Sequence, residues 1–340
     1  MADMTDAPFC TIVRRVSDPP HPNPLPIGER EQFRSPIMFR EMVASDAIVR
    51  ENPKTLEMVK FEPIERPIIQ QIFGSEPEVM GRAAAIIMER FAPDGIDINM
   101  GCPVYKLTSN FNGAALMKEP ERAADIVRTI KSAIGDSAPV SVKIRLGWSD
   151  LTQGREFAKV LEDAGADLIT VHGRTKCQAY TGRADWNEIG EIKKGVSIPV
   201  LANGDIVDAI TAQQALSLSR CDGVMIARGA LGNPWVFREI LKALSFPSDI
   251  GDPETIVDSG SRAGMTVSLS EKISIILQHA ELMIERYGPH GMIQFRKHLS
   301  WYFKGIAGTK ALRMELMEIN TLDELKTILI QSPVVSDQSG

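Results

Sequence analysis

The chain has 340 residues and a formal net charge of −6, with 44% hydrophobic and 24% charged residues. These values are typical of a globular protein, and the length is enough for one large α/β domain with a smaller appendage. Because the sequence holds no run of about 18 apolar residues, we expect no membrane span. The first ten residues, MADMTDAPFC, lack a basic segment followed by an apolar core, so we expect no secretory signal peptide.

Four cysteines are spread widely over the chain, and no two of them form a CxxC pair. We therefore expect neither a disulfide framework nor a zinc or other metal site. Free thiols of this kind are typical of a reducing compartment, so we expect a cytoplasmic protein. The cysteines are Cys10, Cys102, Cys177 and Cys221.

Short runs rich in β-branched residues alternate with amphipathic stretches through the first 240 residues. Helical patterns such as PERAADIVRTIKSAIG and GREFAKVLEDAGA lie between the runs. This alternation predicts a parallel sheet with crossover helices. The predicted strands begin at Pro36, Pro67, Gly95, Pro139, Leu168, Pro199 and Gly223.

These strands, with polar or glycine residues at their carboxyl ends, predict a (β/α)8 TIM barrel that lacks its first strand. A doubly wound sheet is less favoured, because no GxGxxG motif follows the first strand. Barrels carry their sites at the carboxyl ends of the strands. We expect several polar side chains to converge there, namely Cys102, Lys143, His172, Asn203 and Arg228.

Two segments interrupt the pattern. Residues 17–36 are rich in proline, which excludes a helix or a central strand, and we expect a solvated insertion without a catalytic role. Residues 246–270 are rich in Gly, Ser and Asp and are expected to form a linker. The expected organisation is a catalytic barrel over residues 1–245, a small all-helical domain over 271–332 and a disordered tail over 333–340.

The strand GIDINMG runs on directly into Cys102. Ile96 and Ile98 alternate with Asp97 and Asn99, which gives the strand one apolar and one polar face. One interpretation of Cys102 is a small structural residue, since free cysteine is among the most buried residue types. The other is a thiol held at the mouth of the barrel for chemistry.

A glycine-bearing strand end that leads into a short helix, late in a barrel, is typical of a phosphate site. The segment ARGALGNPW has this form at Arg228, and ANGD precedes it at residues 202–205. Together they predict a phosphate-bearing cofactor, with Lys143 and His172 reaching polar atoms of a flavin ring. Taken singly, the same residues also fit a snorkelling lysine, a structural histidine and an ordinary turn.

A basic block runs from Arg286 to Arg313, with six Lys or Arg residues and no Asp or Glu. Such a block on an acidic protein is typical of a phosphate-binding surface. The alternative is an amphipathic helical core with a solvated basic face. Because no acidic residue interrupts the 28 residues, the block favours an RNA-binding surface, to which its aromatic residues would contribute.

These motifs, in this order, resemble those of the tRNA-dihydrouridine synthases, and the chain is most similar to the bacterial B-type branch. The resemblance runs from residue 1 to residue 330, apart from the insertion. The motifs are MADMTDAPF, FGSEPEV, DGIDINMGCPV, VKIRLGW, VHGRT, CQAYTGRADW, ANGDI, ARGALGNPW and FRKHLSWYFKG.

The resemblance implies an FMN-dependent reductase that converts uridine in tRNA to 5,6-dihydrouridine with NADPH. Hydride would pass from flavin N5 to C6 of the base, and Cys102 would give the proton to C5. A thiol, with a reference pKa of about 8.5, is a suitable acid. We expect a cytoplasmic monomer that binds tRNA through residues 271–332 and has no stable protein partner.

The resemblance also implies the site residues. The FMN contacts are expected at Met1, Ala2, Gln71, Lys143, His172, Asn203, Gly204, Asp205, Ala227 and Arg228. The substrate contacts are expected at Asn99, Arg145, Arg174, Arg296 and Lys297.

The apolar strand that normally precedes the MADMTDAPF motif is absent from the sequence, so we expect an N-terminally incomplete barrel. Two alternatives stay open. Another FMN barrel, of the dihydroorotate dehydrogenase type, would share the phosphate site but have no use for the basic helical tail. A truncated, catalytically impaired homologue would keep RNA binding through that tail without the flavin.

Overall fold

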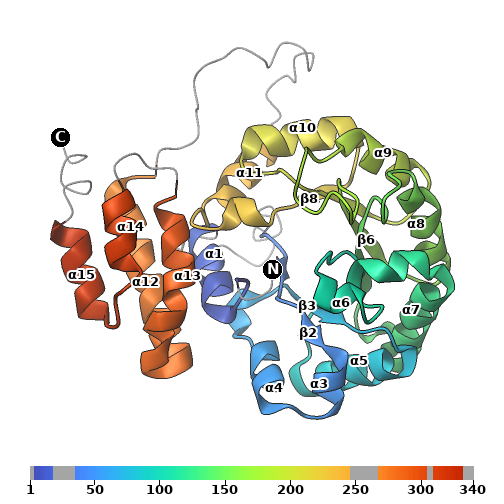
Figure 1. The fold of residues 1–340 in the computed structure, drawn as a ribbon, viewed down its shortest axis with the longest axis horizontal. Coiled ribbons are helices and arrows are strands. Elements are labelled where there is room, and N and C mark those ends of the chain that lie inside the picture. Colours follow the sequence, from blue (N-terminus) through green and yellow to red (C-terminus); the bar gives the residue numbers. More distant parts are fainter. Residues whose placement is uncertain (1–3, 18–34, 246–266, 305–308, 332–340) are drawn as a thin grey trace, which may run out of the picture. The chain divides into compact units, whose positions relative to one another are not determined.

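The computed structural model describes residues 4–17, 35–245, 267–304 and 309–331, and its chain divides into two compact units (Figure 1). The first unit comprises residues 1–5 and 37–227, and the second comprises residues 6–36 and 228–340. Met1 and Ala2, most of the predicted insertion and linker, and the predicted tail lie outside the described residues.

A curled, all-parallel sheet forms the centre of the first unit, as the sequence predicts. It runs in the order β1-β3-β4-β5-β6-β7-β8, and β2 pairs with β3 next to the β1 pairing. The predicted TIM-barrel-like fold is therefore confirmed. The strands are β1 (Met38–Phe39), β2 (Val43–Ala44), β3 (Ile68–Phe73), β4 (Gly95–Asn99), β5 (Val140–Arg145), β6 (Leu168–His172), β7 (Val200–Asn203) and β8 (Gly223–Met225).

Helices surround this sheet on its outer side (Figure 1). Three of them begin with proline at the first helical position, where the missing N–H is not needed: Pro53, Pro77 and Pro120. The α-helices are α3 (Ser45–Val49), α4 (Pro53–Val59), α5 (Pro77–Phe91), α6 (Tyr105–Thr108), α7 (Pro120–Ile134), α8 (Gln153–Asp163), α9 (Trp186–Lys194) and α10 (Ala209–Ser219). Short 3-10 turns are η1 (Pro63–Glu65), η2 (Gly113–Lys118) and η3 (Gly135–Ser137).

The alternation of side chains along the strands separates an apolar face from a polar face. Ile96 and Ile98 of β4 belong to one apolar cluster with Met80 and Ile87 of α5. Because successive strand residues point to opposite faces, Asp97 and its neighbours of the same parity project away from that cluster. The polar face of the sheet is therefore available to build a site.

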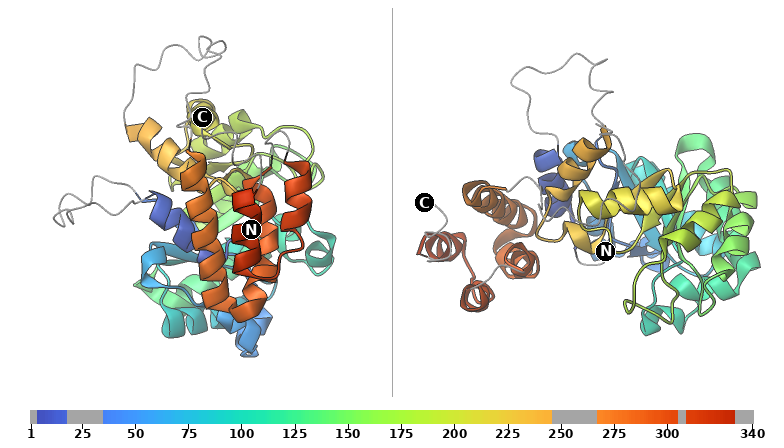
Figure 2. Two further views of the ribbon diagram at one scale, coloured as in Figure 1. Left: turned by 90° about the vertical axis from the view of Figure 1, so that its left-hand side faces the viewer. Right: turned by 90° about the horizontal axis from the view of Figure 1, so that it is seen from above.

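The second unit is helical, as the sequence predicts for its C-terminal part (Figure 2). Its apolar cluster brings Trp235, Phe295, Leu299 and Tyr302 together with Ile12 of the first helix of the chain. The elements are α1 (Ala7–Ser17), η4 (Arg228–Ala230), α11 (Val236–Ser245), α12 (Leu269–Tyr287), η6 (Gly288–His290), α13 (Gly291–Tyr302), α14 (Lys310–Leu316) and α15 (Leu322–Gln331). Among the described residues, no helix has the length and apolar character that a membrane crossing requires.

A buried polar cluster ties α1 to α13 inside this unit. The carboxylate of Asp6 accepts a hydrogen bond from the backbone N–H of Phe9 and lies 3.1 Å from Nε2 of His298 and 3.4 Å from Nζ of Lys297. Burial by itself raises the pKa of Asp6, but the charge and hydrogen bond of His298 outweigh it, and the pKa lies well below its usual range. His279 is also close by, with Nδ1 3.0 Å from the hydroxyl of Tyr302.

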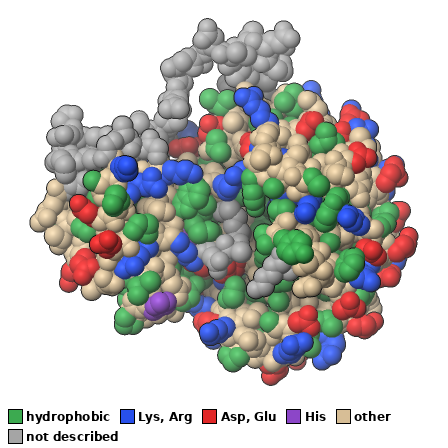
Figure 3. Space-filling view, in the orientation of Figure 1, with side chains coloured by type: hydrophobic (Ala, Val, Ile, Leu, Met, Phe, Trp, Pro, Cys, Tyr) green, Lys and Arg blue, Asp and Glu red, His purple; other side chains and the backbone are tan. Residues whose placement is uncertain are grey.

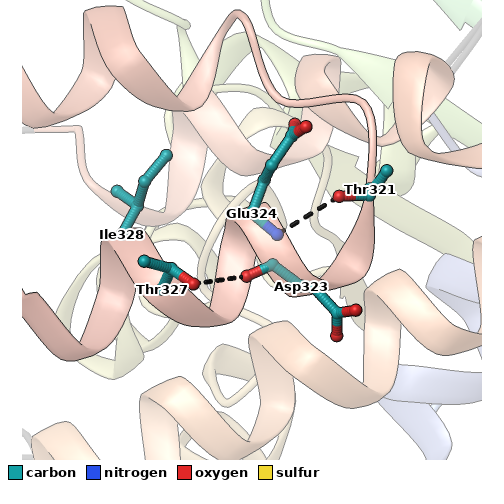
Figure 4. Close-up of a pocket in the computed structure, with 5 residues that line it drawn as sticks. All are labelled: Thr321, Asp323, Glu324, Thr327 and Ile328. Carbon is teal, nitrogen blue, oxygen red and sulfur yellow. Dashed lines mark hydrogen bonds between the residues drawn. The ribbon is translucent and has the colours of Figure 1, made fainter.

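A shallow depression lies along the start of α15 (Figure 4). Its polar groups bond to one another: the hydroxyl of Thr321 accepts from the backbone N–H of Glu324, and Thr327 donates to the carbonyl of Asp323. These are the hydrogen bonds of a helix start and of one helical turn. The depression is therefore explained by the helix itself.

Candidate active site at the carboxyl ends of the strands

Five side chains predicted to form the site lie on the polar face of neighbouring strands. The sheet register sets Asn99 opposite Lys143, and His172 opposite both Arg145 and Asn203. All of these residues lie at or near the carboxyl ends of β4 to β7, where sites of barrel proteins are found. The predicted convergence of Lys143, His172 and Asn203 is therefore built into the sheet.

Cys102 lies in the loop that follows β4, and Asn99 holds that loop. The side-chain oxygen of Asn99 accepts hydrogen bonds from the backbone N–H groups of Cys102, at 2.9 Å, and of Gly101, at 3.2 Å. A Cβ at Gly101 would approach the backbone of Ile144 to 3.2 Å, so the loop passes close to β5. The Cys102 side chain is neither fully buried nor fully exposed.

The other side of Cys102 packs against η2. Gly113 has a φ of +59°, and a Cβ there would come within 2.9 Å of the Cys102 carbonyl oxygen. The same carbonyl accepts a hydrogen bond from the backbone N–H of Ala114 at 3.1 Å. The Cys102 backbone is therefore held by Asn99 on one side and by η2 on the other, which fixes the position from which its side chain projects.

Lys143 and Asn203 connect β5, β7 and β8. Nζ of Lys143 donates to Oδ1 of Asn203 at 3.0 Å, and Nδ2 of Asn203 donates to the carbonyl of Met225 at 2.8 Å. Burial and, next, the positive charge of Arg145 lower the pKa of Lys143 to about 8, against an opposing effect of Asp97 and Cys102. The electrostatic environment of Lys143 is therefore set by burial and by three neighbouring side chains.

Gly204 positions His172. Its φ is +113°, and a Cβ there would lie 2.8 Å from Cδ2 of the His172 ring. The carbonyl of Gly204 also accepts a hydrogen bond from Nε1 of Trp186 at 3.0 Å. A larger residue at this position would displace the imidazole, so glycine is required here.

Arg145 and Arg174 make contacts that hold loops in place. Nε of Arg145 donates to the carbonyl of Gly101 at 2.7 Å, and its Nη1 donates to the carbonyls of Thr175 and Ala179. Arg174 pairs with Asp205 at 2.7 Å and donates to the carbonyls of Thr181 and Gly182. The substrate contacts expected for both arginines stay predictions; the structure gives each a role in the architecture of the site.

Asp97 was not among the predicted site residues, although its polarity and its parity with Asn99 were visible in the sequence. Its side chain is fully buried, and it accepts hydrogen bonds from Nε2 of Gln71 at 2.5 Å and from Oγ of Ser141 at 2.6 Å. Burial raises the pKa of Asp97, and the two hydrogen bonds and Lys143 oppose that shift. A buried carboxylate therefore lies directly beneath the predicted site.

The remaining predicted residues belong to other places in the fold. Ala227 follows β8 at the end of the first unit, and Arg228 is exposed at the start of η4 in the second. Arg296 of α13 donates to the carbonyls of Glu318 and Ile319, and Lys297 pairs with Asp6. Both α13 cations thus have partners inside their own unit, and their expected RNA contacts stay predictions.

Comparison with known proteins identifies the family. The model of the dihydrouridine synthase (Dus) family matches residues 1–336. A Synechocystis protein named "Probable tRNA-dihydrouridine synthase 1" is 38% identical over 299 residues, covering 87% of this chain and 79% of that protein. Proteins named "Probable tRNA-dihydrouridine synthase" from Rhodobacter capsulatus and Rickettsia conorii are 37% and 34% identical, covering 93% and 92% of this chain and 88% and 85% of their own lengths. The resemblance read from the motifs is confirmed, and the chain belongs to the dihydrouridine synthase family.

Proposed function

We propose that this protein reduces uridine to 5,6-dihydrouridine in tRNA, with FMN as its flavin and NADPH as the reductant. The observation that carries the proposal is the placement of Cys102: Asn99 and Ala114 fix its backbone just after β4, next to the strand that carries Lys143. Membership of the dihydrouridine synthase family supports the same reaction. We further propose a cytoplasmic monomer.

The donor set on the polar face fits a flavin ring. A partly buried ammonium on β5, a buried imidazole on β6 and buried amides on β3 and β7 lie toward the carboxyl ends of the strands, at Lys143, His172, Gln71 and Asn203. Such groups match the carbonyl oxygens and ring nitrogens along the polar edge of an isoalloxazine. When bound and reduced, FMN supplies the hydride that C6 of the uracil ring receives.

Cys102 then acts on the substrate as the general acid. Once C6 of uracil has gained hydride, C5 carries the negative charge, and a proton passes from the Cys102 sulfur to C5 to complete the 5,6-single bond. The resulting thiolate regains its proton from water, because the side chain is partly exposed. Atoms and charge balance without a further reactant.

Exposed cations of the basic block supply a surface for RNA. Lys304, Lys310 and Arg313 are exposed, and Nζ of Lys304 lies 4.0 Å from the centre of the Trp301 ring. Lys and Arg side chains are visible on the face of the helical unit shown in Figure 3. Extracting a uridine from its stack costs a few kcal/mol, so the enzyme needs such a surface to grip the RNA.

The test is a comparison of substrates. We expect the purified protein to show the visible absorption of a bound flavin and to oxidise NADPH when given tRNA that lacks dihydrouridine. Turnover of a free pyrimidine such as dihydroorotate in place of tRNA would contradict the proposal. A colourless protein that binds tRNA without turnover would contradict it as well.

A further inference from the structure

We propose that Asp97 is a positioning residue, whose carboxylate sets the orientation of two side-chain amides and through them the backbone that carries Cys102. The inference rests on the proposed role of Cys102, but its geometry does not. A continuous chain of hydrogen bonds starts at the buried carboxylate and ends at the loop after β4. Gln71 and Asn99 are the two residues that link Asp97 to Cys102 in this chain of hydrogen bonds.

The links of this chain are short, and the two between side chains are buried. Nε2 of Gln71 donates to Oδ2 of Asp97 at 2.5 Å, and Nδ2 of Asn99 donates to Oε1 of Gln71 at 2.9 Å. Oδ1 of Asn99 then accepts from the backbone N–H of Cys102 at 2.9 Å. The hydroxyl of Ser141, on the neighbouring strand β5, donates a hydrogen bond to the other carboxylate oxygen of Asp97.

The direction of the chain follows from its two ends. An ionised carboxylate only accepts hydrogen bonds, so Gln71 must turn its NH2 group toward Asp97 and its carbonyl toward Asn99. Asn99 must in turn present its NH2 group to Gln71, which leaves its carbonyl oxygen for the loop. A backbone N–H only donates, so this is the one arrangement in which every contact pairs a donor with an acceptor.

Reversing either amide breaks the chain at the catalytic loop. If Gln71 turned over, its carbonyl would face the carboxylate and its NH2 group would face the NH2 group of Asn99. If Asn99 followed, its NH2 group would face the N–H groups of Gly101 and Cys102, and the loop would lose both hydrogen bonds. Asp97 therefore acts on Cys102 although its nearest side-chain partners are Gln71 and Ser141.

The cost of burying a charge supports a specific role for Asp97. A fully buried carboxylate is unfavourable unless its oxygens are hydrogen-bonded and a positive charge lies near. Here burial raises the pKa of Asp97, while a hydrogen bond to each oxygen and, next, the charge of Lys143 oppose that shift and favour the charged form. A neutral side chain would avoid the cost, but an amide in its place could face Gln71 in either orientation.

The experiment exchanges the amide of residue 71 and the carboxylate of residue 97. Gln71→Glu sets two carboxylates against each other, so they repel or share a proton. In the double variant Gln71→Glu, Asp97→Asn, the amide of residue 97 donates to Glu at 71, which still accepts from Asn99. The double variant keeps the net charge of the natural chain and restores a donor–acceptor pair between positions 71 and 97.

The readout is the alkylation rate of each cysteine by iodoacetamide, resolved by peptide mass spectrometry at several pH values. We expect Gln71→Glu to label Cys102 about tenfold faster relative to the exposed Cys177, because repulsion between the two carboxylates moves residue 71 away from Asn99 and loosens the loop, and the double variant to return to within about twofold of the natural protein. Buried Cys221 reports unfolding of the same unit. Unchanged labelling of Cys102 in Gln71→Glu, or no recovery in the double variant, would overturn the proposal.

A second variant covers the case in which the two facing carboxylates prevent folding, which rapid labelling of Cys221 would reveal. Asp97→Asn alone puts a neutral side chain at position 97 and so sets no two charges against each other. We expect it to raise Cys102 labelling while Cys221 stays protected. We also expect kcat for dihydrouridine formation to fall up to about 10²-fold, with little change in KM for tRNA. No rise in labelling would overturn the proposal. Since alkylation does not require Cys102 to protonate the substrate, failure of its proposed acid role would leave this result intact.

Discussion

The side-chain oxygen of Asn99 lies 2.9 Å from the backbone nitrogen of Cys102 and accepts its hydrogen bond. This contact spans only three residues, yet it joins the end of a buried strand to the loop that carries the thiol. It makes Asn99 part of the architecture of the site, in addition to the substrate contact that the motif resemblance implies. The geometry of the thiol therefore depends on an amide, and the amide depends on the strands beside it.

Replacing Asn99 by alanine is expected to slow dihydrouridine formation up to about 10²-fold. The N–H groups of Gly101 and Cys102 lose their acceptor, so the position of the thiol is no longer fixed. Single-turnover assays with saturating tRNA measure this step. Asn99→Asp is the matched variant, since it keeps the acceptor for the loop but loses the donor to Gln71. Full activity in Asn99→Ala would contradict the account of the loop.

Activity is expected to decline as pH rises through the pKa of Lys143. Burial and the charge of Arg145 lower that pKa from 10.5 to about 8, so the ammonium is present below pH 8 and is lost above it. The profile of kcat/KM against pH should show a falling limb near 8. In Lys143→Met the rate should be lower and the falling limb should move, because the lysine no longer contributes to it; a rate and a pH profile identical to those of the natural protein would contradict this role of Lys143.

Asp6→Asn is expected to lower the free energy of unfolding of the helical unit by about 3–5 kcal/mol, since it leaves buried His298 without its carboxylate. The depressed pKa of Asp6 means that its contribution is complete above the pKa of an unfolded aspartate, about 3.9, and is lost as pH falls below it. Urea titrations at several pH values measure this. Asp323→Asn, at an exposed position of α15, serves as control, and equal effects of the two variants would refute the prediction.

Replacing Lys304, Lys310 and Arg313 together by glutamine is expected to weaken tRNA binding and to reduce the slope of log K against log salt by up to about two, because phosphate contacts release counterions. Filter binding at several salt concentrations provides the slope. Lys54→Gln, on exposed α4, is the control outside the basic block. Arg296 is less suited to this test, since its guanidinium is bound to the carbonyl of Ile319. An unchanged slope in the triple variant would remove these cations from the RNA surface.

Local sequence pattern predicted the strands, the helical C-terminal unit and the position of Cys102 at a strand end. These features depend on periodicity and on residues close together in the chain, which a sequence displays directly. The polar parity of Asp97 and Asn99 was also visible in the strand. Their connection through Gln71 was not, because it depends on the register between β3 and β4.

Long-range contacts account for the rest. Asp6 and His298 are in contact although 292 positions separate them in the sequence, and no local pattern predicts that pair. Arg145 and Arg174 were expected to contact substrate because of the motif resemblance, whereas their hydrogen bonds to loop carbonyls depend on where those loops fold back. Side-chain donors directed at backbone carbonyls leave no signature in the sequence.

Cys102→Ala tests the central claim most directly. Mass spectrometry of nucleosides from tRNA treated with FMN-loaded protein and NADPH measures dihydrouridine, and the absorption spectrum of each variant measures flavin content, with Cys177→Ala as the matched control. We expect Cys102→Ala to keep its flavin and to form dihydrouridine about 10²- to 10⁴-fold more slowly, the usual effect of losing a general acid. An undiminished rate in Cys102→Ala would contradict the assignment and return this thiol to a structural role.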